Sequence, residues 1–310
     1  MHILVTGGAG FIGANLCRAL ERAGHRATAF DDLSTGFAAN LDGTDTRLIV
    51  GSILDPNAID AAASDADAIV HLAARPSVPR SVADPVPSHD VNATGTVNVL
   101  EAARRDGSRH VITAGSSSVY GANPTLPKHV GLATRPVSPY AASKLAAEAY
   151  TLAYGHSYDL PTLSFRFFNV FGPLQAAGHA YAAVIPAFVD AALAGRPLPV
   201  HGDGTQSRDF TFVDTLTAVV VDALERQVTS DEPVNLAYGT RTDLLTVIEE
   251  MRALMDESIE IDFQPVRAGD VPHSQADDSQ IRTLFPSVVP TPLDTGLKAT
   301  IDWMRGVHSA

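Results

Sequence analysis

The chain has 310 residues, of which 45% are hydrophobic and 18% charged, and its 35 acidic and 22 basic side chains give a formal net charge of -13. This composition is typical of a soluble globular protein, and the length suggests about two domains. The negative charge argues against a nucleic acid partner, and the single cysteine, Cys17, excludes an intrachain disulfide.

The N-terminal stretch MHILVTGG is a short apolar strand that runs into glycines, without the basic region or cleavage site of a signal peptide. No later run reaches the roughly 18 apolar residues that a membrane crossing needs. We therefore expect a cytoplasmic protein that makes no membrane contact. No two of the 11 histidines have metal-ligand spacing near a third ligand, so we predict no metal site.

Short apolar segments alternate with longer helical patterns up to about residue 170. This alternation predicts an α/β fold, a Rossmann-type doubly wound parallel sheet whose ligands lie beyond the carboxyl ends of the strands. The predicted strands are HILVT (2–6), RATAF (26–30), RLIVG (47–51), AIVHLAA (68–74), HVITAG (110–115) and TLSFRFF (162–168).

The segment VTGGAGFIGANLCRAL joins the first predicted strand to a helix. Gly8, Gly10 and Gly13 match the dinucleotide pattern G-x-G-x-x-G. Gly7, Gly10 and Gly13 match the shifted spacing G-x-x-G-x-x-G. In either pattern, Gly10 lets the backbone approach a pyrophosphate and Gly13 lets the helix pack closely on the sheet. The helix N-terminus then offers free N–H groups to the anion.

The second predicted strand ends in FDDLSTG. Asp31 follows Gly13 by 18 residues, where a carboxylate can accept hydrogen bonds from the adenosine ribose hydroxyls and would repel a 2′-phosphate. This spacing predicts NAD rather than NADP as the cofactor. Asp32 is a second candidate, although a solvated loop carboxylate is its simpler interpretation.

The stretch SPYAASKLAAE places Tyr140 and Lys144 at positions i and i+4 of a helix that begins near Ser138, so both project from one face. A phenol of pKa ~10 needs a depression of roughly three units to act as a base near neutrality, and a neighbouring ammonium supplies part of it. The pair therefore predicts a phenolate that takes a hydroxyl proton while hydride leaves the same carbon for NAD+.

A serine cluster, AGSSSVYG (114–121), follows an earlier predicted strand. A serine hydroxyl there can pass a proton between substrate and tyrosine, although such a cluster alone is more often turn chemistry. From FGPLQAAGHA (171–180) onward the sequence changes to loops rich in glycine and proline, with helical patterns near 214–226 and 243–256. We expect an NAD-binding Rossmann domain over 1–173. Residues 174–310 are expected to form mainly a smaller substrate-binding α/β lobe, with some segments of either range belonging to the other part.

Together these motifs resemble the extended short-chain dehydrogenases/reductases, in the UDP-glucose (UDP-hexose) 4-epimerase branch of the NAD-dependent epimerase/dehydratase family. The resemblance covers nearly the whole chain and rests on TGGAGFIG, HLAA, DVNATGTVNVLEAAR, SSSVYG, YAASK, RFFNVFGP, YAAVIP, GDGTQSRDF and RAGDVPHSQAD. It implies the catalytic residues Ser116, Tyr140 and Lys144. Dehydratases of this superfamily carry an Asp-Glu pair after the catalytic hydroxyl. This chain has Ser117 and Ser118 there, without the acid that expels water.

The resemblance also implies which residues surround the ligands. Those expected around NAD are Gly7, Gly10, Phe11, Ile12, Gly13, Asp31, Asp32, Ser52, Ile53, Leu72, Ala73, Ala74, Asn92, Tyr140 and Lys144. Those expected around the substrate are Ser118, Asn169, Ala183, Val184, Arg208, Arg267, Asp270 and Ser274. The arginines suit a diphosphate because a guanidinium binds phosphate bidentately.

Two departures from the family pattern leave questions open. Ser52 stands where many relatives carry an adenine-contacting aspartate, which leaves adenine recognition to Asp55 or to main-chain groups. Leu174 stands where many relatives have an arginine, and this leaves the identity of the sugar less certain.

We expect an enzyme that interconverts UDP-glucose and UDP-galactose through a 4-keto intermediate, with transient hydride transfer to tightly bound NAD+. Ser274 leaves room for an acetamido group, and PSVPRS (76–81) resembles the N-acetylhexosamine branch, so UDP-GlcNAc and UDP-GalNAc are expected as further substrates. The alternatives are a UDP-glucuronate 4-epimerase or decarboxylase, and, in another class, a non-catalytic NAD-sensing module. The resemblance also implies a homodimer that pairs the helices over 92–105 and 140–154.

Overall fold

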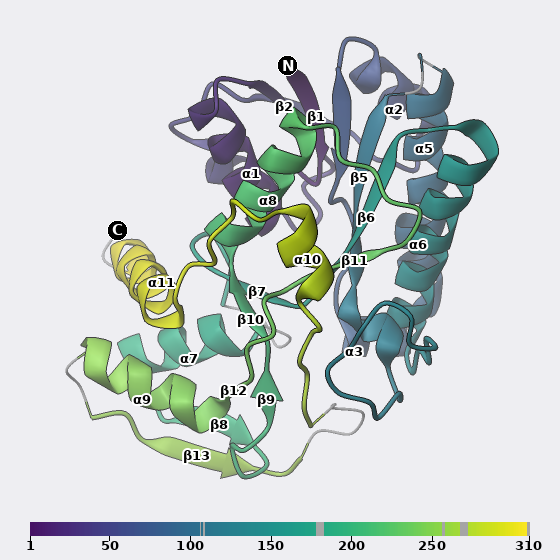
Figure 1. The fold of residues 1–310 in the computed structure, drawn as a ribbon. Coiled ribbons are helices and arrows are strands. Elements are labelled where there is room, and N and C mark those ends of the chain that lie inside the picture. Colours follow the sequence, from purple (N-terminus) through teal and green to yellow (C-terminus); the bar gives the residue numbers. More distant parts are fainter. Residues whose placement is uncertain (106, 108, 178–182, 256–257, 267–271, 309–310) are drawn as a thin grey trace.

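The computed structural model describes residues 1–105, 107, 109–177, 183–255, 258–266 and 272–308. Its largest layer is a sheet of seven strands in the order β11-β6-β5-β4-β1-β2-β3, and every neighbouring pair runs parallel (Figure 1). The strands are β1 (His2–Thr6), β2 (Arg26–Asp31), β3 (Arg47–Val50), β4 (Ala68–His71), β5 (His110–Ser116), β6 (Thr162–Phe167) and β11 (Val234–Leu236). The six strands predicted from the sequence are confirmed, and β1, β4 and β6 are buried along their whole length, as in parallel sheets covered on both faces, whereas the edge strand β3 is partly exposed.

Helices cover both faces of this sheet (Figure 1). On one face, α1 (Phe11–Arg22) packs against α8 (Val213–Glu225), and on the other α2 (Pro56–Ala63) and α6 (Pro139–Tyr158) flank α5 (Gly95–Arg105). The fold is therefore the doubly wound α/β arrangement that the sequence predicted. The strand order reverses between β1 and β4, and ligands of such sheets bind at the carboxyl ends beside this switch point.

A second, smaller body has its own apolar core, to which Phe188, Met251 and Ile301 contribute. Its helices are α7 (Val184–Leu193), α9 (Leu244–Met255) and α11 (Leu293–His308). Its strands pair two by two, β10 with β7, β12 with β9 and β13 with β8. They are β7 (Asn169–Phe171), β8 (Leu198–His201), β9 (Ser207–Arg208), β10 (Phe210–Phe212), β12 (Thr242–Asp243) and β13 (Ile261–Gln264).

The chain enters the second body at β7 and later returns to the first. Helix α8 packs on α1, β11 pairs with β6, and α10 (Ser279–Leu284) places Ile281 in the core beside the large sheet. The boundary at residue 173 remains a prediction, and the structure adds these returning segments to the first body. The remaining elements are η1 (Ala38–Leu41), α3 (Val78–Ala83), α4 (Pro85–His89), the π-helix Asp90–Thr94 and η3 (Ser117–Tyr120). None of the helices in the described ranges combines the length and the apolarity that a membrane crossing requires.

Candidate active site

A cleft of about 630 Å³ lies at the carboxyl ends of the parallel strands, where β1, β2, β3, β4 and β5 end. Its lining comes from segments that are far apart in the sequence and include the N-terminal part of α6. The predicted site residues that line it are Gly7, Gly10, Phe11, Ile12, Gly13, Asp31, Asp32, Ser52, Ile53, Leu72, Ala73, Ala74, Ser116, Tyr140 and Lys144. The structure thus brings the three predicted catalytic side chains and almost all predicted cofactor residues to one place.

The glycine loop has the shape that a dinucleotide phosphate requires. Gly7 has φ +70°, and a Cβ there would lie 2.7 Å from the Ala73 nitrogen, whereas a Cβ on Gly13 would lie 2.1 Å from the Gly7 oxygen. These two glycines are therefore required by packing within the loop. A Cβ on Gly10 would meet only the Gly7 oxygen, at 3.2 Å, and Gly10 caps α1 without any side-chain hydrogen bond. Open space at an uncapped helix N-terminus fits a phosphate group.

Asp31 ends β2 and is buried beside this loop. Its Oδ2 accepts a hydrogen bond from the Ala9 nitrogen at 3.0 Å, and its Oδ1 accepts one from the Leu33 nitrogen at 2.8 Å. Burial raises the pKa of Asp31, while these two backbone bonds act in the opposite direction. Each carboxylate oxygen retains a lone pair for a ribose hydroxyl. Asp32 is exposed, and its Oδ1 accepts from the Ser34 nitrogen at 2.9 Å.

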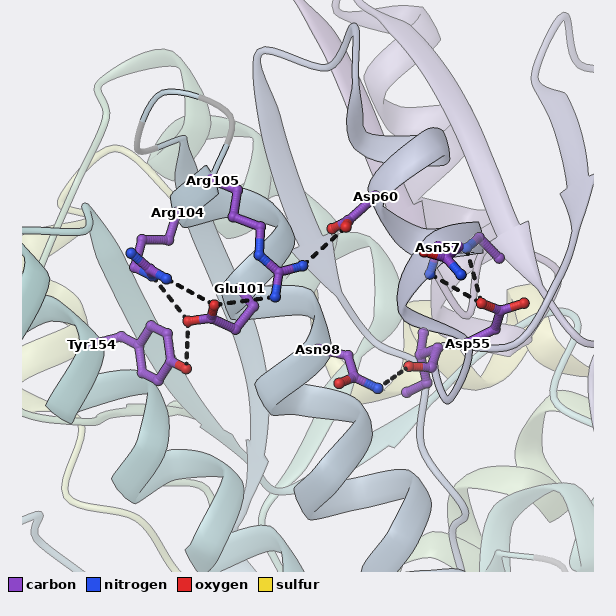
Figure 2. A network of polar contacts seen from close by, with 10 residues as sticks. Asp55, Asn57, Asp60, Asn98, Glu101, Arg104, Arg105 and Tyr154 are labelled. Carbon is purple, nitrogen blue, oxygen red and sulfur yellow. Dashed lines mark hydrogen bonds and ion pairs between the residues drawn. The ribbon is translucent and has the colours of Figure 1, made fainter.

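The loop after β3 contains Ser52 and Asp55, which the sequence analysis considered for adenine recognition. Asp55 is absent from the described lining of the cleft, because its carboxylate caps α2 by accepting from the nitrogens of Asn57 and Ala58 at 3.0 and 3.2 Å (Figure 2). Asn98 of α5 donates to the Ile53 carbonyl at 2.9 Å and holds the loop in place (Figure 2). Ser52 and Ile53 line the cleft, so recognition of the adenine by main-chain groups of this loop stays a prediction, while the Asp55 carboxylate is engaged as an N-cap.

The helix that carries the predicted tyrosine and lysine is fixed at its first turn. The Ser138 hydroxyl accepts from the Ala141 nitrogen at 3.1 Å, and the Tyr140 nitrogen donates to the buried Ser81 hydroxyl at 3.0 Å. Such capping satisfies N–H groups that a helix start otherwise leaves unpaired. One turn later, the Lys144 ammonium donates to the Ala114 carbonyl at the end of β5, at 2.9 Å. The sequence interpretation of SPYAASK as a helix start is confirmed.

The three predicted catalytic groups differ in their electrostatics. Burial raises the pKa of the Tyr140 phenol, and its hydrogen bond with the Ser116 side chain acts in the opposite direction. Burial also lowers the pKa of Lys144 to about 8. The Ser116 oxygen accepts from the Ser118 hydroxyl at 2.8 Å and from the Ser118 nitrogen at 3.2 Å. The Ser116 hydrogen therefore stays available to Tyr140 or to a substrate.

Substrate candidates line a second cavity of about 390 Å³, which shares Phe168 and Val170 with the cleft. The predicted substrate residues that line it are Asn169, Ala183, Val184 and Arg208. Ser118 and Ser274 line neither cavity among the described residues, and the Ser274 nitrogen donates to the Ser207 carbonyl at 3.0 Å, next to Arg208. Arg267 and Asp270 lie outside the described residues.

Asn92 lies behind the cleft rather than in it. This side chain is 1% exposed and contacts the peptide of Arg75 and the Ser143 hydroxyl, so a direct cofactor contact, expected from the resemblance, does not fit the structure. Sequence reasoning also missed lining residues, among them Ser34, Thr35, Arg75, Arg80 and Gln175. Most of these lie in a loop within four residues of the end of a strand, and this position is the signal that could have identified them.

A buried histidine next to the site was missed as well. The His71 ring lies between the hydroxyl oxygens of Thr6 and Thr96, with nitrogen-to-oxygen distances of 2.7 and 3.0 Å. Burial, together with the charge of Lys144, lowers the pKa of His71 to about 3, so the ring is neutral at physiological pH. Among the residues that the structure describes, no group of three or more His, Cys, Asp or Glu side chains could hold a metal ion.

The chain is similar to known proteins over nearly its whole length. The model of the NAD dependent epimerase/dehydratase family matches residues 3–237. A UDP-glucose 4-epimerase of Mycolicibacterium smegmatis is 36% identical over 98% of this chain and 99% of its own length. A probable UDP-glucuronate 4-epimerase of Rhizobium meliloti is 30% identical over 98% and 96%. The solved UDP-N-acetylglucosamine 4-epimerase of Methanobrevibacter ruminantium superposes with a TM-score of 0.93 at 33% identity, over 99% and 98% of the two chains.

Proposed function

The chain belongs to the NAD-dependent epimerase/dehydratase family and is an NAD-dependent nucleotide-sugar epimerase, and from this premise we propose that its substrates are UDP-hexoses. It interconverts UDP-glucose and UDP-galactose, and also UDP-GlcNAc and UDP-GalNAc, through a 4-keto sugar. This proposal rests on one observation: Ser116, Tyr140 and Lys144 line the same cleft as the glycine loop. The absence of an acid at Ser117 and Ser118 supports epimerisation over dehydration.

In this proposal each residue has one task. NAD+, when bound, supplies the acceptor that takes the C4 hydride and returns it to the opposite face of the sugar. Tyr140 accepts the proton of the 4-hydroxyl and later gives it back. Ser116 transfers that proton, and Ser118 orients the Ser116 oxygen through the 2.8 Å hydrogen bond. Lys144, whose pKa of about 8 keeps it protonated at neutral pH, favours the phenolate by its charge.

The second cavity accounts for the rest of the substrate. Arg208 lines it and binds the diphosphate, because a guanidinium donates two parallel hydrogen bonds to phosphate. Asn169 contacts the diphosphate or the sugar, and its nitrogen is anchored to the Asp209 carbonyl at 3.2 Å. Arg267 and Asp270 surround the nucleotide in the same proposal. Residues 1–173 and 174–310 act as the NAD-binding domain and the substrate-binding lobe.

We also propose that the enzyme is a homodimer that pairs α5 and α6 of each subunit. Tyr150 and Tyr158 on α6 are 47% and 49% exposed, which supports an apolar contact on that face. Size-exclusion chromatography with light scattering measures the subunit number directly, and a monomeric mass would contradict this arrangement.

A second candidate function is 4-epimerisation of UDP-glucuronate. The similarity to the Rhizobium protein supports it. A substrate carboxylate needs a cation near the sugar, and Arg80 lines the cleft together with Tyr140. The two candidates differ in whether the enzyme requires a 6-carboxylate.

The test uses the purified protein without added cofactor. It is incubated with UDP-, dTDP- and CDP-linked sugars, including UDP-glucose, UDP-GlcNAc and UDP-glucuronate, and the products are resolved by chromatography. We expect 4-epimers of the first two UDP-sugars and none from Tyr140→Phe. A 4-epimer from UDP-glucuronate alone would establish the second candidate. No 4-epimer from any sugar would contradict both, and would favour an NAD-sensing module.

A further inference from the structure

Arg75 lines the cleft, yet its guanidinium is only weakly engaged by the protein. Its side chain is 37% exposed, and the nearest carboxylate oxygen, Oδ2 of Asp84, is 3.7 Å from its NH2. That separation is longer than a hydrogen bond. Its Nε is buried and has no hydrogen-bond partner among the described residues. Because an atom that faced the empty cleft would be accessible, this buried Nε does not face the cleft, and a ligand there would meet the exposed part of the side chain.

The backbone of Arg75, in contrast, is held firmly. Oδ1 of the buried Asn92 accepts from the Arg75 nitrogen at 2.7 Å, and Nδ2 of Asn92 donates to the Arg75 carbonyl at 3.3 Å. The same Nδ2 donates to the Ser143 hydroxyl at 2.9 Å, and Ser143 precedes Lys144 on α6. Asn92 belongs to the π-helical turn Asp90–Thr94, a distortion that often marks functional positions. Asn92 therefore fixes Arg75 relative to the helix of the predicted tyrosine and lysine.

The position of Arg75 along the cleft identifies what it faces. Two residues before it, Ala73 is in van der Waals contact with the glycine loop, since a Cβ on Gly7 would lie 2.7 Å from the Ala73 nitrogen. The loop that carries Arg75 is thus next to the glycine loop at Ala73 and is tied to α6 through Asn92 and Ser143. A dinucleotide whose adenosine ribose is at Asp31 and whose other end is at Tyr140 carries its diphosphate through this region.

The charges of the side chains around the cleft also indicate the diphosphate as the group that Arg75 faces. Residues 7–13 of the glycine loop contain no basic side chain, and Asp31 and Asp32 at the neighbouring end of the cleft are acidic. Helix N–H groups alone would have to balance a dianionic diphosphate in a chain of net charge -13. Arg80 and Lys144 line the cleft too, but Arg80 already interacts with another group of the protein, and the Lys144 ammonium donates to the Ala114 carbonyl. A guanidinium from the loop after β4 supplies the missing positive charge.

We propose that Arg75 binds the diphosphate of NAD through its guanidinium, and that Asn92 is the positioning residue that orients it. The nitrogens of the guanidinium match two phosphate oxygens in a bidentate contact. This inference concerns the cofactor and does not depend on which sugar the enzyme accepts. If Arg75 does not bind the diphosphate, the proposed UDP-hexose activity is unaffected. If the enzyme does not accept UDP-hexoses, the proposal for Arg75 is likewise unaffected.

The first experiment measures binding of radiolabelled NAD+ by exchange into the protein as purified. Arg75→Gln keeps much of the side-chain length and removes the charge, so we expect NAD+ affinity to fall about 10- to 100-fold, the range for a hydrogen bond to a charged group. Arg75→Lys should recover part of the loss. Arg47→Gln, an exposed arginine at the start of β3, is the matched control and should bind as the wild type does. Unchanged affinity in Arg75→Gln would overturn the proposal.

The second experiment separates the diphosphate from other ligands by competition against bound labelled NAD+. ADP-ribose retains the diphosphate, whereas adenosine has no phosphate. Arg75→Gln should therefore weaken the binding of ADP-ribose and leave the binding of adenosine unchanged. Equal weakening of both would show a merely structural role and overturn the proposal. If UDP binding weakened while ADP-ribose binding did not, the anion would belong to the substrate, which would also overturn it.

The positioning role of Asn92 is tested by a double-mutant cycle on the same NAD+ exchange. Asn92→Ala should weaken NAD+ binding in the wild type, and should cause little further loss in Arg75→Gln, because the charge that it orients is already gone. Additive losses in the two backgrounds would show that Asn92 acts independently of Arg75.

Discussion

Glu148 and Arg166 form a bidentate ion pair in the core, with Nε to Oε2 at 2.8 Å and NH2 to Oε1 at 2.7 Å. Both side chains are 4% exposed, and the guanidinium carbon lies 4.7 Å from the centroid of the Tyr120 ring. Glu148 follows Lys144 by one turn on α6, and Arg166 lies on β6. The pair therefore joins the helix of the predicted catalytic side chains to the sheet.

Glu148→Gln should destabilise the protein strongly, because it leaves the Arg166 charge buried without its partner. Breaking a buried pair in this way costs about 3–5 kcal/mol of the free energy of unfolding. Urea denaturation measures the loss. Asp302→Asn, which removes the exposed ion pair with Lys298, is the matched control and should change stability little. A loss in Glu148→Gln no larger than in this control would mean that the pair is not structural.

Ser116→Ala should shift the pH dependence of turnover. The hydrogen bond with Ser116 lowers the pKa of Tyr140, so its removal raises that pKa further above its ordinary value. The phenolate is the active form, and activity rises as pH passes the pKa. The ascending limb of kcat/KM should therefore move to higher pH, with a fall of about 10²- to 10⁴-fold near neutrality.

The measurement is the pH profile of kcat/KM for the UDP-hexose that the enzyme accepts. Tyr140→Phe has no phenol and should show no such limb. Ser117→Ala, the neighbouring serine, should keep the wild-type profile. If the ascending limb of kcat/KM lies at the same pH in Ser116→Ala and in the wild type, Ser116 does not lower the pKa of Tyr140.

Asp31→Asn should weaken the discrimination between NAD+ and NADP+. Asparagine has the shape of aspartate and keeps an oxygen that can accept a backbone N–H, but it lacks the charge that repels a 2′-phosphate. The ratio of the two dissociation constants should shift towards NADP+ by about tenfold or more, since a charge at contact distance contributes several kcal/mol. Asp32→Asn, at the exposed neighbour, should shift it less. An unchanged ratio would remove Asp31 from the ribose site.

Ser274→Tyr should exclude the acetylated sugars selectively. Ser274 lines neither cavity itself, but its backbone hydrogen bond to the Ser207 carbonyl holds it next to Arg208, which lines the second cavity, and we propose that the larger side chain of a tyrosine extends into that cavity. We expect kcat/KM to fall for UDP-GlcNAc and UDP-GalNAc and to persist for UDP-glucose and UDP-galactose. Parallel loss for both pairs, or a wild type that ignores UDP-GlcNAc, would show that Ser274 does not determine sugar size.

Much of the fold and part of the site could be predicted because they depend on local patterns. The six predicted strands up to residue 168 are apolar runs of the right length, and the glycine spacing before α1 belongs to one loop. Tyr140 and Lys144 share a face because a helix brings i and i+4 together, whatever surrounds it. That these elements meet at one cleft follows from the parallel sheet, whose carboxyl ends all lie at one edge.

The tertiary structure alone decided the contacts that join distant parts of the chain. Nothing near Asn92 in the sequence indicates that its amide holds the peptide of Arg75 behind the cleft, and the partner of Glu148 is Arg166, on another element. Asp55, an adenine candidate in the sequence, is an N-cap in the fold. A side chain's role depends on which groups are within about 3 Å of it, and for buried polar groups those partners are usually far away in sequence.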